Sequence, residues 1–184
     1  VRLGARVGDL LDAAGPAIQG GRSAEIEALH AEEVLIDKHH AAILKFLEHV
    51  LEAERAPDVS HNAIDLIEAA DYLEAIADLV DREIIPLYRR HAERGSDSDG
   101  ASRERLQGLS EAVRAEFRRA LQAVGEENRE LARAILESKS SVRELERAVL
   151  DSPVDANVED GPRFVRPSAL DRELAESLRR GYSL

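Results

Sequence analysis

The sequence has 184 residues, of which 43% are hydrophobic, 34% charged and 3% aromatic, with a formal net charge of −12 and no cysteine. This length suits one domain or two small similar halves, and the composition is typical of long helices packed side by side. The acidic balance argues against sequence-independent binding of nucleic acid, which needs basic surface, and the absence of Cys excludes disulfides and thiolate metal sites.

The acidic charge is concentrated in the first half of the chain. Residues 1–95 carry 10 Lys and Arg against 19 Asp and Glu, whereas residues 96–184 carry 15 against 18. No apolar run approaches the roughly 20 residues that a membrane-spanning helix needs. The sequence begins at Val1 and contains no Met, so we expect a piece, processed or excised, of a longer protein, and we expect this piece to be soluble.

Apolar residues recur every three or four positions along most of the chain, as in amphipathic helices. The first such stripe runs from Leu3 to Ile18 and ends at Gly20, and Pro57 separates the second helix from the third. Pro86 lies inside the third helix and predicts a kink or an early end, because proline lacks an N–H and its ring clashes with the preceding turn. The predicted helices span residues 3–18, 23–54, 58–94, 106–124, 131–149 and 168–180.

A polar segment, residues 95–100, interrupts the pattern at mid-chain, and residues 152–167 hold three prolines and no periodicity. The order is therefore three helices, a linker and three further helices. We expect an all-α fold, a six-helix antiparallel bundle made of two three-helix repeats, 1–95 and 101–184, which form one compact domain.

The third helix carries the most informative pattern. One of its stripes is apolar at both ends and acidic in the middle, where Asp71, Glu74, Asp78 and Asp81 follow one another at three- and four-residue spacing. Such carboxylates repel one another by a few tenths of a kcal/mol per pair unless a cation lies among them. The alternative is that the neighbouring stripe, Leu66 to Leu87, forms the core and the acids are a solvated flank.

The second helix favours the first interpretation. Its apolar seam, from Ile26 to Val50, is interrupted by Glu33 and His40, and Asp37 follows Glu33 by one turn. A carboxylate in an apolar seam costs free energy unless it is paired, protonated or bound to a cation. Glu33 and Asp37 opposite Glu74 and Asp78 would form an oxygen-rich site of the kind that Mg, Mn, Fe or Zn accept. His40 is a weaker candidate, because a lone His at an apolar face is usually a satisfied core residue.

The string from Ala69 to Asp78 resembles the helix of PhoU-like domains that carries a Glu-x-x-x-Asp metal-binding motif, here Glu74 and Asp78. The likeness extends over nearly the whole chain and is greatest to the cytosolic C-terminal domain of sodium/phosphate cotransporter-related proteins. Members often carry the motif in both repeats. In this sequence the second copy keeps Asp171 but has Ala175 in place of the second acid.

The resemblance implies one metal site in the first half, with Glu74 and Asp78 as its main ligands. Glu33 and Asp37 are further candidates, and Asp71 is an outer ligand or a residue that tunes the charge. It also implies a regulatory role, in which intracellular phosphate or a bound divalent metal controls a sodium-dependent phosphate transporter from the cytoplasmic side of the membrane. The expected partners are the attached or neighbouring transport domain, phosphate and a second copy of the chain.

Three other functions remain open. A free-standing PhoU-type adaptor would act on a separate phosphate transporter and sensor kinase, and a metal-free helical module would bind a partner protein. A ferritin-like dimetal oxidase is suggested by Glu27 and His30, but that fold needs a second Glu-x-x-His, which the sequence lacks. We expect no enzyme, because the sequence has no glycine-rich phosphate loop and no nucleophile elbow.

Overall fold

The computed structural model describes residues 2–19, 23–53, 57–93, 100–151 and 169–183. Over these residues the chain is helical and contains no strand, which confirms the all-α prediction. None of the helices in these ranges combines the length and the apolar character that crossing a membrane would require. The elements are α1 (Arg2–Gln19), α2 (Ser23–Ala53), α3 (Pro57–Leu79), the π-helical segment η1 (Val80–Ile84), α4 (Ile85–Glu93), α5 (Gly100–Gly125), α6 (Arg129–Glu137), α7 (Lys139–Leu150) and α8 (Ala169–Ser183).

These elements form six helical stretches along the described chain, two of which are interrupted. The expected third helix does not end at Pro86 but passes through η1 into α4. The ring of Pro86 would clash with the carbonyl of Arg82 in a regular α-helix, and the wider π-turn relieves that conflict. The expected fifth helix is divided at Ser138 into α6 and α7.

The break at Ser138 has a clear local cause. The Ser138 hydroxyl oxygen lies 2.8 Å from the carbonyl oxygen of Ile135 and 2.9 Å from Glu116 Oε2, and its single hydrogen serves one of these two acceptors at a time. A serine side chain that bonds the backbone competes with the helical hydrogen bonds. The prediction of one uninterrupted helix over residues 131–149 was therefore wrong. Periodicity alone had placed Ser138 within the apolar stripe of this helix.

By the packing of its residues the chain falls into two compact units, and the boundary between them along the sequence lies between Glu83 and Ile84. This division is one of packing and does not coincide with the repeat boundary expected at residues 95–101. The difference arises at α4, which follows α3 and η1 along the chain but packs on α8.

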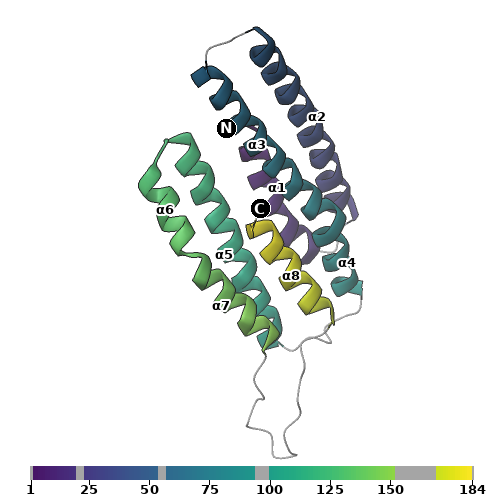
Figure 1. Ribbon diagram of the computed structural model, residues 1–184. Coiled ribbons are helices and arrows are strands. Elements are labelled where there is room, and N and C mark those ends of the chain that lie inside the picture. The colour runs from purple at the N-terminus through teal and green to yellow at the C-terminus, as the bar shows by residue number, and fades with distance from the viewer. Residues whose placement is uncertain (1, 20–22, 54–56, 94–99, 152–168, 184) are drawn as a thin grey trace, which may run out of the picture. The chain divides into compact units, whose positions relative to one another are not determined.

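In the first unit, α1, α2 and α3 pack against one another, and consecutive helices run in opposite directions (Figure 1). The expected stripe of α1 is buried at Leu3, Val7, Leu10 and Ala14. On α3 the purely apolar stripe supplies the core, although its first member, Leu66, is 54% exposed. The buried residues that α2, α3 and η1 add to this unit are Ile26, Leu29, Ile36, Leu47, Ala63, Ala70, Ile76, Ala77, Leu79 and Val80.

In the second unit, α5, α7 and α8 pack against one another, and α6 continues the hairpin of α5. Asn128 caps α6 by accepting a hydrogen bond from the backbone N–H of Leu131 at 3.0 Å. Arg90 of α4 and Glu173 of α8 form an ion pair at 3.1 Å. The core of this unit includes Leu106, Leu109, Val113, Val142, Val149, Leu170, Leu174 and Leu178.

Candidate metal centre

Three carboxylates of the first unit converge between α2 and α3. Glu33 and Asp37 lie one turn apart on α2, and Asp78 lies near the end of α3. Each offers one oxygen, and the three oxygens lie within 4.8 Å of one another. The structure therefore brings together three of the five residues expected at the site, from the two helices that the sequence indicated.

Glu33 is the most buried member of this triad, with 9% of its surface exposed. It occupies the apolar seam between Leu29 and Ile36, both of which are buried. Burial raises the pKa of the Glu33 carboxyl, and the neighbouring Asp37, Asp81 and Asp78 carboxylates raise it further. A carboxylate in this setting gains from any group that supplies positive charge.

Asp78 presents an oxygen without a satisfied hydrogen bond. Its Oδ1 atom is buried and accepts no hydrogen bond. Arg82, one turn further on in η1, places its Nη2 atom 3.0 Å from this oxygen. The two groups attract as an ion pair, but their orientation is not that of a hydrogen bond, so the lone pairs of Oδ1 are not used by an N–H donor. Such an atom in a cluster of acids fits a cation ligand.

Glu74 lies beside the triad, one turn before Asp78 on α3, and is half-buried. Its pKa is raised by burial and by the Asp78 and Asp37 carboxylates, while His40 and Arg82 act in the opposite direction. Glu74 therefore shares the electrostatic environment of the triad without being one of the three residues whose oxygens converge.

Asp71 and Asp81 have partners of their own on α2. Asp71 is exposed and accepts a hydrogen bond from His40 Nε2 at 2.7 Å. Asp81 contacts the Nδ1 atom of His30. The His40–Asp71 pair links α2 to α3, and the His30–Asp81 pair links α2 to η1. Along α2 the two pairs lie on opposite sides of the triad. His40 thus has a carboxylate partner, as expected for a satisfied histidine, and Asp71 lies outside the triad.

Two neighbours of the site were not predicted. Arg82 was not recognised, although its position four residues after Asp78 was the available signal. His30 was considered only as part of a Glu-x-x-His pair with Glu27, whereas its contact is with Asp81. Its position three residues before Glu33 on α2 was the available signal.

The donor set indicates which cations would fit. Glu33, Asp37 and Asp78 supply only carboxylate oxygens, and hard cations such as Mg²⁺ and Mn²⁺ prefer such ligands. Zn²⁺ usually takes nitrogen or sulfur ligands as well. The triad therefore fits Mg²⁺ and Mn²⁺ best among the four metals that the sequence suggested.

In the second unit, the positions that the expected repeat would make equivalent to the acidic residues do not form a second acidic cluster among the described residues. On α8, Asp171 is 1% exposed and Ala175 is fully buried. Lys139 and Arg143 on α7, which the expected repeat would align with Glu33 and Asp37, are exposed. Among the described residues, the acidic group that could hold a cation lies in the first unit.

Comparisons of the chain with protein-family models, with curated proteins and with solved structures found no match. The similarity to PhoU-like domains therefore continues to rest on the sequence features given above.

The raised pKa of Glu33 has a measurable consequence in the metal-free chain. Because the pKa of Glu33 is higher in the folded than in the unfolded state, the folded chain holds the proton of this carboxyl more tightly. The protonated Glu33 carboxyl therefore favours the folded state. This contribution to the free energy of unfolding is fully present below the ordinary carboxyl pKa of 4.5, and it is lost as the pH rises through the raised pKa of the folded chain. We expect Glu33→Gln to raise the free energy of unfolding at pH 7 by roughly 0.5–1 kcal/mol, since it removes several like-charge contacts.

Urea unfolding in the presence of a chelator, repeated across this pH range, tests the prediction. The advantage of Glu33→Gln should shrink as the pH is lowered toward the ordinary carboxyl pKa. The exposed Glu48 of α2 provides the control, and Glu48→Gln should leave the stability unchanged. A Glu33→Gln protein that is less stable than wild type at pH 7 would contradict the account.

Proposed function

We propose that this chain is a helical regulatory domain that binds a divalent cation between α2 and α3. The observation that carries the proposal is the convergence of Glu33, Asp37 and Asp78, whose oxygens lie within 4.8 Å of one another and include the buried Oδ1 of Asp78. A cation there would offset the mutual repulsion of the three carboxylates and hold the two helices together.

The resemblance to PhoU-like domains extends this proposal to phosphate-dependent regulation. Three carboxylates leave coordination positions of a divalent cation open, and a phosphate oxygen is a suitable ligand for them. Glu74 and Arg82 lie beside the triad and would influence the net charge that an arriving phosphate meets. Binding would favour one packing of α2 on α3, and an attached sodium-dependent phosphate transporter would respond to that change.

Phosphate binding is tested by following thermal unfolding and hydrogen exchange of the full chain with Mg²⁺, with inorganic phosphate, and with both. We expect phosphate to add stability and exchange protection in α2 and α3 only when Mg²⁺ is present. Sulfate serves as the control for general anion effects. If phosphate changes neither quantity, with or without the metal, the proposed regulation by phosphate is wrong, whereas metal binding alone would still stand.

A second candidate is a metal-free helical module that binds a partner protein. Arg82 favours it, because its guanidinium already supplies positive charge to Asp78 at 3.0 Å. In this case Arg82→Ala would destabilise the chain and divalent cations would have no effect. In the metal-binding case Arg82→Ala would strengthen cation binding, because the guanidinium no longer competes for Asp78.

A further inference from the structure

The outer side of α2 carries a second apolar stripe, separate from the one that packs in the core. It consists of Ala24, Ala28, Ala31, Leu35, Ala42 and Phe46, all of which are exposed. Leu35 is 39% and Phe46 67% exposed. The spacing of four, three, four, seven and four residues places them along one face of the helix. A helix that is apolar on two sides is typical of one that is covered on both.

Four members of the stripe lie in pairs at equal distances from Leu35, whereas the position equivalent to Ala31 is held by His39. Ala28 and Ala42 are each seven residues from it, and Ala24 and Phe46 are each eleven residues from it. In an antiparallel pair of α2 helices related by a two-fold axis at Leu35, each Ala28 would meet the partner's Ala42. The large Phe46 would meet the partner's small Ala24, so a bulky side chain opposes a small one at each end.

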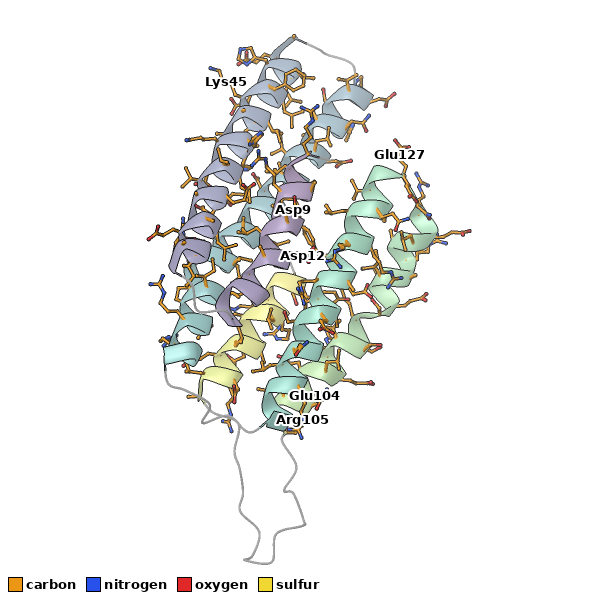
Figure 2. All side chains as sticks on the ribbon, turned by 180° about the vertical axis from the view of Figure 1, so that it is seen from behind. Asp9, Asp12, Lys45, Glu104, Arg105 and Glu127 are labelled. Carbon is orange, nitrogen blue, oxygen red and sulfur yellow. The ribbon has the colours of Figure 1, made fainter. Side chains whose placement is uncertain are left out.

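The charges beside the stripe are complementary in this antiparallel arrangement. Glu27 and Lys45 lie on one flank, eight residues before and ten residues after Leu35. In antiparallel helices the same flanks face each other, so Glu27 would lie near the partner's Lys45, and this contact occurs twice. Lys45 is exposed toward the C-terminal end of α2 (Figure 2). On this flank the aliphatic stem of Lys38 would cover the partner's Val34, which is 46% exposed.

We propose that α2 is the interface of a homodimer, in which two copies of this chain pair their outer α2 stripes in antiparallel orientation about Leu35. The contact from Ala24 to Phe46 extends over about 33 Å of helix. A single pair of helices gives an interface at the small end of the range, so the dimer dissociates on dilution. The surface is distinct from the acidic triad, and chelators leave the dimer intact.

Sedimentation equilibrium of the full chain over a wide range of concentrations tests the pairing. We expect a monomer–dimer equilibrium for the wild type, and loss of the dimer in Phe46→Asp and in Leu35→Glu. The matched control is Leu66→Glu, because Leu66 of α3 is equally accessible, at 54% exposed, but lies outside the stripe. It should dimerise like the wild type. A wild type that stays monomeric, or a dimer that survives both stripe variants, would overturn the proposal.

Two further variants test the orientation. Glu27→Lys should weaken the dimer at least tenfold, because it places like charges together twice, and Glu27→Lys combined with Lys45→Glu should restore it. Since the chain has no cysteine, Leu35→Cys introduces a single thiol on the two-fold axis, and mild oxidation should link two copies far faster than in Leu66→Cys. Failure of the double exchange to restore dimerisation, or equal cross-linking of the two cysteine variants, would rule out this pairing.

Discussion

Addition of Mn²⁺ at about one hundred times its dissociation constant should raise the free energy of unfolding of the wild-type chain by about 2.7 kcal/mol. The stabilisation arises because the folded chain holds Glu33, Asp37 and Asp78 together, whereas the unfolded chain does not. The same addition should have almost no effect on Asp78→Ala, which removes the buried oxygen that accepts no hydrogen bond. Thermal unfolding at a series of Mn²⁺ concentrations measures both proteins.

The control for this experiment replaces a carboxylate of the same helix outside the triad. Asp65 of α3 is exposed, and Asp65→Ala removes one negative charge, as Asp78→Ala does. It should retain the full stabilisation by Mn²⁺. Equal responses of the two variants would show that Mn²⁺ acts through the general acidity of the chain rather than through a site at the triad.

Leu109→Ala should lower the stability of the second unit by about 2–5 kcal/mol. Leu109 of α5 is fully buried, and truncation both removes its contacts and leaves a cavity in the core. Leu136→Ala is the comparison within the same unit, because the Leu136 side chain of α6 is 63% exposed. Its effect should stay within about 0.5 kcal/mol.

Chemical denaturation followed by circular dichroism measures both leucine variants. The expected result is a lower midpoint for Leu109→Ala and a midpoint close to that of the wild type for Leu136→Ala. If the two variants were equally stable, the packing of α5 with α7 and α8 described above would be incorrect.

The sequence allowed much of the helical fold to be predicted, because burial follows spacing where a helix has one apolar stripe. On α1 the residues Leu3, Val7, Leu10 and Ala14 are all buried as expected. On α3 two stripes lay side by side, and spacing could not decide how far the helix is rotated about its axis. That rotation depends on the neighbouring helices, and it leaves Ile64 46% and Leu66 54% exposed.

The location of the candidate site could be predicted, but not which of the acidic residues converge there. Acids at one-turn spacing on two helices indicated a cluster, and Glu33, Asp37 and Asp78 do converge. The helical spacing gave no sign that Asp71 would pair with His40, whereas Arg82 stands four residues after Asp78, at the spacing of a helical ion pair. A pair between two helices, such as that of Asp71 with His40, depends on how the helices are aligned along their axes, which periodicity does not fix.

Metal content measured by elemental analysis is the most direct test of the proposed site. The wild-type chain, a Glu33→Ala/Asp78→Ala variant and a Glu48→Ala/Asp65→Ala control would each be dialysed against trace divalent metals. The account predicts that the wild type and the control retain about one Mg²⁺ or Mn²⁺ per chain and that the triad variant retains none. Equal metal content in all three proteins, or no metal in the wild type, would contradict it.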